Sequence, residues 1–166
     1  MKYHFDLAGT TTVKASNGSA PLNGTIDAVL DLKTGNYTAA LVLKKTTAKL
    51  SILGFLPGTA DVDFAQVGDT TGTLKDGVLT SSSKVIVKLP SVKLLGVEIA
   101  GGPTCVSKTP ADIALKSTEA VFNPLKGGPI TGTYTIPELK DCGALTAIVN
   151  PFAAGPGNVI KANLTR

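Results

Sequence analysis

The strongest pattern in the chain is an alternation of apolar and polar residues between residues 24 and 44. Ile26 and Leu30 lie on the same side of this pattern, and the alternation resumes at Tyr37 after the turn-forming segment 33–36. A period of two residues on both sides of a Gly-Asn turn is typical of a β-hairpin that buries one face. We therefore predict a hairpin over residues 24–44.

A second hairpin is predicted around the Lys-Asp-Gly turn at residues 75–77. The strand that leaves this turn alternates from Leu79 to Leu89, with apolar and small residues sharing one face. Pro90 has no backbone N–H to donate, so we expect it to interrupt the strand ladder. A separate strand is predicted over residues 92–99.

Short apolar segments separated by Gly, Pro and Asn turns continue through the rest of the chain. The other predicted strands are 3–7, 11–15, 48–53, 60–64, 112–116, 130–136, 145–149 and 159–164. Segment 117–124 is compatible with one helical turn, and nothing indicates the strand–helix alternation of a parallel α/β sheet. About a dozen short strands predict an all-β fold, an antiparallel β-sandwich or a flattened barrel, with residues 1–166 as a single β-domain.

Cys105 and Cys142 are the only cysteines in the chain. In a β-rich chain, an isolated pair predicts one disulfide and an oxidising compartment; two buried free thiols are the alternative. In the chain-entropy account, closing a loop of about 38 residues stabilises the fold by ~4 kcal/mol. Two thiolates and a distant His4 do not complete a tetrahedral zinc site, and no Cys-x-x-Cys motif is present, so we expect neither a metal nor a redox centre.

The charged residues argue against nucleic acid as a partner. The net charge is +4, but it comes from lysines scattered along the chain, with Arg166 as the only arginine and no tryptophan. Nucleic-acid sites use arginines and stacking aromatics, whereas dispersed lysines keep an apolar β surface soluble.

Neither a transmembrane segment nor a signal peptide is predicted. No stretch reaches the roughly 20 continuous apolar residues of a membrane span. Asp6 follows Met1 too closely for the apolar region of a leader. We therefore expect that an exported form of this protein has lost its leader.

The sequence offers little catalytic chemistry. His4 is the only histidine, so any Ser–His or Cys–His scheme would have to use it, and it lies in the first few residues. Two acid pairs, Asp27 with Asp31 and Asp61 with Asp63, could each share a strand face, but such pairs are typical of a solvated hairpin face. No nucleotide or cofactor motif is present, so we expect no catalytic residue and no cofactor.

Three apolar segments do not alternate: residues 50–57, 92–97 and 144–152. A strand that is apolar on both faces is buried on both sides or contacts something else. The alternatives are central strands of the core, a partner surface, or a cavity for an apolar ligand. The candidate binding residues are Leu53, Phe55, Leu56, Leu95, Val97 and Phe152.

Four short motifs are distributed over most of the chain. They are Tyr-His-Phe-Asp-Leu-Ala-Gly-Thr-Thr at 3–11, Gly-Thr-Ile-Asp-Ala at 24–28, Thr-Gly-Thr-Tyr-Thr-Ile-Pro at 131–137 and Cys-Gly at 142–143. With these motifs the chain resembles small secreted proteins of actinobacteria and similar Gram-positive bacteria. The resemblance implies export and a β-fold, but the group has no assigned activity, so it implies no functional residue.

These observations lead to one functional hypothesis and two alternatives. The first is an exported, non-enzymatic β-domain that binds a protein or cell-surface partner, or serves as a structural module; pairing at an exposed strand edge is one such binding mode. The second is a carrier that holds an apolar, lipid-like ligand in a cavity between sheets. The third, least favoured, is a hydrolase that uses the paired aspartates.

Overall fold

The computed structural model describes all residues from Met1 to Arg166 and contains thirteen strands and one short helix. The elements are β1 (Lys2–Val13), β2 (Gly18–Leu30), β3 (Asn36–Leu43), β4 (Thr46–Ile52), β5 (Leu56–Gln66), β6 (Thr70–Lys75), β7 (Val78–Leu94), β8 (Val97–Ala100), β9 (Val106–Ser107), β10 (Ala111–Ser117), β11 (Gly127–Ile136), β12 (Leu139–Lys140), α1 (Thr146–Ala153) and β13 (Gly155–Thr165). All strand pairs are antiparallel. The prediction of an all-β fold is therefore confirmed.

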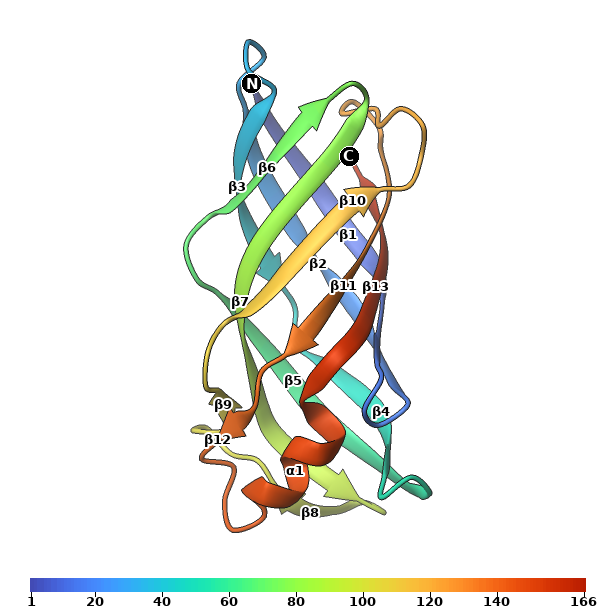
Figure 1. The fold of residues 1–166 in the computed structure, drawn as a ribbon, viewed down its shortest axis with the longest axis vertical. Coiled ribbons are helices and arrows are strands. Elements are labelled where there is room, and N and C mark those ends of the chain that lie inside the picture. The colour runs from blue at the N-terminus through green and yellow to red at the C-terminus, as the bar shows by residue number, and fades with distance from the viewer.

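The upper half of the molecule is a closed barrel. Its eight strands pair in the order β1, β13, β11, β10, β7, β6, β3 and β2, and β2 pairs back onto β1. Figure 1 shows this ring as the upper part of the elongated molecule, with both chain termini at its upper end. Of the two architectures expected from the sequence, the barrel is therefore the one that forms.

The lower half is built differently because β7 changes partners along its length. Its first half pairs with β6, and its second half, from Val85 onward, pairs with β5, which in turn pairs with β4. Where β3 and β5 diverge, the Gln66 side-chain amide accepts a hydrogen bond from Leu41 N (2.8 Å) and donates one to Ala39 O (3.2 Å). Gln66 thus satisfies backbone groups that the split sheet leaves without a strand partner.

Alternation along the strands separates the core from the surface. In β1 and β2 nearly every second residue is buried, and their neighbours face solvent. The hairpins predicted at 24–44 and 75–77 are confirmed, with Leu30 opposite Tyr37 and Lys75 opposite Val78. Two apolar clusters result, one inside the upper barrel and one in the lower half.

Pro90 interrupts the strand ladder, as predicted, but the expected end of the strand at this point is wrong. β7 continues through Pro90 to Leu94, and the pairing with β5 shifts register between Asp61 and Asp63, so the bulge accommodates the missing N–H. The separate strand predicted at 92–99 is wrong as well, because a turn divides it between β7 and β8.

The strand predicted at 145–149 is wrong, because this segment begins the eight-residue helix α1. Val149 and Phe152, three residues apart, face the lower core. Asn150 accepts a hydrogen bond from Leu139 N (2.7 Å) and donates one to Leu139 O (3.2 Å), which ties the helix to β12. The helical turn predicted within 117–124 does not form; residues 118–122 are bends and irregular chain.

The predicted disulfide between Cys105 and Cys142 is present, with the two Cα atoms 4.2 Å apart. Both residues are fully buried in the lower cluster, beside β9 and β12. The bond therefore fixes two very short strands that have few ladder hydrogen bonds of their own. The only helix is too short to traverse a bilayer.

Candidate functional site: an apolar chamber and two apolar turns

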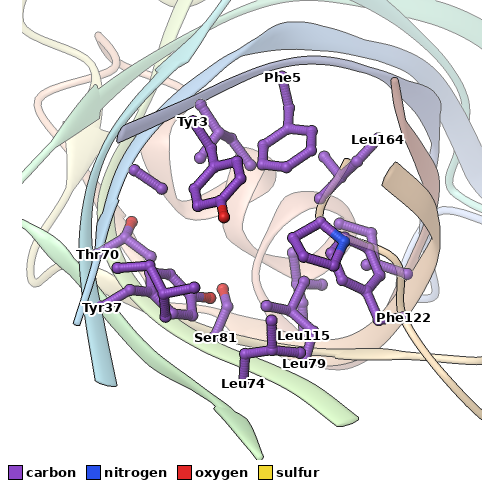
Figure 2. A pocket seen from close by; sticks show the side chains of 15 residues that line it. Tyr3, Phe5, Tyr37, Thr70, Leu74, Leu79, Ser81, Leu115, Phe122 and Leu164 are labelled. Carbon is purple, nitrogen blue, oxygen red and sulfur yellow. The ribbon is translucent and has the colours of Figure 1, made fainter. Parts of the chain in front are cut away.

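The upper barrel encloses an apolar chamber with a free volume of about 50 Å³. Figure 2 shows side chains from opposite walls converging on an open centre. The lining residues are Tyr3, Phe5, Ile26, Ala28, Leu30, Tyr37, Thr70, Leu74, Leu79, Ser81, Leu115, Phe122, Pro124, Ile130 and Leu164. Three inward-facing leucines, Leu74, Leu79 and Leu115, are only partly buried, so solvent reaches this space.

The chamber exists because small side chains face inward on one wall. Ser81 of β7, Thr70 of β6 and Ala28 of β2 occupy positions that larger aliphatic residues fill elsewhere in the barrel. Gly72 contributes in another way: a Cβ there would lie 2.5 Å from the Tyr37 ring, so the glycine lets this ring lie against β6. Since volume in a small barrel is set by its inward side chains, this wall leaves the centre unfilled.

Hydroxyl groups provide the only polarity in the chamber. The Tyr37 hydroxyl donates a hydrogen bond to Thr80 O (2.8 Å) and lies beside Ser81, while the Tyr3 hydroxyl also points inward (Figure 2). Burial raises the pKa of Tyr37 to about 12, with the Ser81 hydrogen bond as the smaller, opposing effect. The Tyr37 hydroxyl is therefore uncharged at physiological pH.

Two aromatic lining residues of the chamber, Phe122 and Tyr3, make further contacts. Phe122, from the segment between β10 and β11, packs edge-on against Phe5 with ring centroids 6.3 Å apart, and its N–H binds Gly77 O at 2.7 Å. The guanidinium carbon of Arg166, the only arginine, lies 5.2 Å from the centroid of the Tyr3 ring. A cation thus lies next to a residue that lines the chamber.

A second apolar cavity, also about 50 Å³, lies in the lower half, where Phe152 of α1 lines it. A packed layer separates the two cavities. The buried residues Leu7, Leu22, Val85, Ile113 and Ile160 belong to the upper cluster but line neither space. The barrel interior is therefore two separate compartments.

The six candidate binding residues from the sequence divide into two groups. Leu53, Phe55, Leu95 and Val97 are exposed (71%, 74%, 67% and 65%) at the turns of the β4–β5 and β7–β8 hairpins. Leu56 is half-buried against the lower cluster, and Phe152 is buried within it. Register brings the two turns together, because Leu94 pairs with Gly58 and Leu95 N donates to Pro57 O (3.3 Å).

The residues considered for catalysis lie apart from both cavities. His4 faces outward from β1 and forms a 2.6 Å contact with Asp27. The other acids have separate local partners: Asp31 binds Lys33 N, Asp61 accepts a hydrogen bond from Thr47, and Asp63 caps Phe64 N. The structure does not bring these groups together around a cleft.

None of the residues that line the upper chamber was predicted from the sequence as a binding residue. The available signal was the inward face of β7, where Ser81 and Ser83 interrupt a series of apolar residues. Small polar residues on an otherwise apolar buried face indicate unfilled space, but only once closure of the barrel is known. Comparison of the chain with protein-family models, with curated proteins and with solved structures found no match to any of them.

Proposed function

We propose that this protein is a non-enzymatic, exported carrier whose upper chamber binds the apolar end of a small amphiphile. The observation that supports this is the Ser81–Thr70–Ala28 wall, which leaves apolar space inside a closed barrel. Closed barrels of eight strands are wide enough to hold one small ligand. The buried disulfide supports export, because such bonds persist in oxidising compartments.

The size of the chamber restricts the ligand. Its volume of about 50 Å³ is smaller than the roughly 150 Å³ of an apolar cavity known to hold benzene. A single alkyl chain end fits this space better than a ring. The guanidinium of Arg166, which lies over the ring of the lining residue Tyr3, favours a ligand with an anionic head, such as a carboxylate.

The test is to titrate decanoate into the protein by isothermal calorimetry and to analyse an organic extract of freshly purified protein by mass spectrometry. We expect saturable decanoate binding by the native protein. Ser81→Leu should fill the chamber and abolish binding, whereas Ser82→Leu, the adjacent outward-facing position, should leave it unchanged.

Two results would overturn the carrier proposal. One is the absence of both decanoate binding and an extracted amphiphile. The other is unaltered decanoate affinity in a folded Ser81→Leu variant, with circular dichroism confirming the fold, because the binding site would then lie outside the chamber.

A further inference from the structure

The two hairpin turns at the lower end of the molecule each have a leucine at a position that requires a positive φ. Leu53-Gly54 and Leu95-Gly96 have φ values of 55° and 83°, and 49° and 82°, so both leucines adopt the left-handed conformation. Hairpin turns that need a positive φ at this position favour Asn, Asp or Gly there, because a branched apolar side chain gains no local hydrogen bond.

The same chain uses the favoured residue at its upper end. In the β6–β7 turn, Asp76-Gly77 has φ values of 52° and 79°, close to those of the two lower turns. The β6–β7 and β7–β8 loops have two residues between the paired strands, and the β4–β5 loop has three. Leucine is therefore not required to form this turn. Two of the three turns with these φ values carry a locally unfavourable leucine, and those two are neighbours in space.

The side chains of Leu53 and Leu95 are not buried in the protein's own core. Leu53 and Leu95 are 71% and 67% exposed, and the following Phe55 and Val97 are 74% and 65% exposed. Together these four side chains form an apolar tip that protrudes from the lower end, where Figure 1 shows the β4–β5 and β7–β8 turns. Backbone strain without compensation in the fold points to a role in contact with something else.

Positive charge lies further back along the strands that carry the tip. Lys49 and Lys93 are exposed and share one row across three adjacent strands, each paired with Thr59. Glu98, the acid in this row, is paired with Lys93 across β7 and β8, so the row remains net positive. The row lies one register position from the pair that flanks the β7–β8 turn and three from the pair that flanks the β4–β5 turn. An apolar end with cations set back along the strands matches the acyl and phosphate layers of an anionic bilayer.

The residue types distinguish a bilayer from a protein partner. Protein interfaces concentrate binding energy in Trp, Tyr and Arg that fill pockets, and the tip contains none of these. Its two turns are convex and lack side-chain hydrogen-bonding groups. We infer that the lower end binds an anionic lipid surface by inserting Leu53, Phe55, Leu95 and Val97 among the acyl chains, with Lys49 and Lys93 near the lipid phosphates.

The strain at the turns permits a decisive variant. Leu53→Asn with Leu95→Asn removes apolar surface from the tip but places a favoured residue in each left-handed position. We expect this double variant to melt at a higher temperature than the native protein and to bind vesicles at least tenfold more weakly. A change that damaged the fold would lower both the melting temperature and the affinity for vesicles.

Binding is measured by co-sedimentation with vesicles of phosphatidylcholine containing phosphatidylglycerol, and with pure phosphatidylcholine vesicles. We expect preference for the anionic vesicles, which Lys49→Gln with Lys93→Gln should remove. Asp76→Asn is the matched control, since it alters the β6–β7 turn at the opposite end and should leave vesicle binding unchanged.

Because the chain has no tryptophan, a single introduced one reports its own surroundings. Phe55→Trp should shift its emission to the blue on adding anionic vesicles, and Val121→Trp, exposed in the segment between β10 and β11, should not. The inference is overturned if the native protein binds neither vesicle, or if the double asparagine variant binds as the native protein does. It is also overturned if ultracentrifugation shows that the tip instead joins two copies of the chain.

Discussion

The buried side chain of Asn158 connects three segments of the chain through hydrogen bonds. Its carboxamide oxygen accepts a hydrogen bond from Lys14 N (3.0 Å), and its nitrogen donates to Tyr134 O (3.1 Å) and Gly155 O (2.8 Å). The residue is 1% exposed, so its carboxamide depends on these three partners for its hydrogen bonds. Polar residues of this kind contribute through the groups they satisfy more than through their own burial.

Asn158→Ala should lower the free energy of unfolding by about 3 kcal/mol, because it removes a buried carboxamide and the three hydrogen bonds that it makes to backbone groups. Asn163→Ala, at an exposed position of the same strand, should change it by less than about 0.5 kcal/mol. Urea unfolding of both variants measures the difference. Equal effects of the two substitutions would contradict this assignment.

The exposed contact between His4 and Asp27 predicts that the stability of the fold depends weakly on pH. The hydrogen bond to Asp27, followed by its charge, raises the pKa of His4 above its usual value, and Asp6 contributes less. The stabilisation is therefore complete below the pKa of an unfolded histidine and is lost as pH rises through the higher pKa of the folded state.

Asp27→Asn should lower the pKa of His4 towards that of a free histidine, as followed by NMR titration of the imidazole signals. Asp6→Asn should lower it by a smaller amount. If the first substitution leaves the His4 pKa unaltered, the 2.6 Å contact does not persist in solution.

Among the elements, those with a clear period of two were predictable from sequence, and those defined by long-range contacts were not. The hairpin at 24–44 and the strands on either side of Asp76 follow directly from alternation and turn residues. The β7 strand extends through Pro90 because β7 itself bulges there, with three residue steps from Lys88 to Ser91 opposite two steps in β5, which no local pattern reveals.

The sequence predicts a strand where helix α1 forms, for a related reason. Its sequence is rich in β-branched and aromatic residues, but its buried side chains, Val149 and Phe152, are spaced by three. The exposed tip residues were identified because they are apolar without alternation. The chamber was not, because its boundaries come from eight strands that meet only after the barrel closes.

Phe152→Ala in α1 should lower the free energy of unfolding by about 3–5 kcal/mol, since it removes a buried aromatic side chain from the lower cluster. Ile148→Ala, on the exposed side of the same helix, should cost less than about 1 kcal/mol. Guanidinium unfolding compares the two. Similar losses would mean that the helix does not bury the face assigned to it.

At the scale of the whole molecule, the two halves have different sources of stability. The upper barrel is held by continuous ladders that close on themselves. The lower half depends on the two-residue strands β9 and β12, on α1 and on the disulfide, with one pair, Ser19 and Lys49, joining β2 to β4. Local opening should therefore begin in the lower half.

Reducing the Cys105–Cys142 bond, which spans 37 residues, should lower the free energy of unfolding by ~4 kcal/mol. Hydrogen exchange should then accelerate first in β9, β12 and α1, while amides of β1, β2 and β13 remain protected. Uniform acceleration throughout the chain would show that the two halves open as one unit.

The antiparallel pairing of the two terminal strands has a mechanical consequence. Asp6 lies opposite Thr165, and both chain ends emerge at the upper end of the barrel (Figure 1). A force applied between the termini would load the β1–β13 hydrogen bonds one after another, as a zipper opens, so the barrel should yield at low tension. Extension would then stop at Cys105 and Cys142, and the 36 residues between them would bear no load.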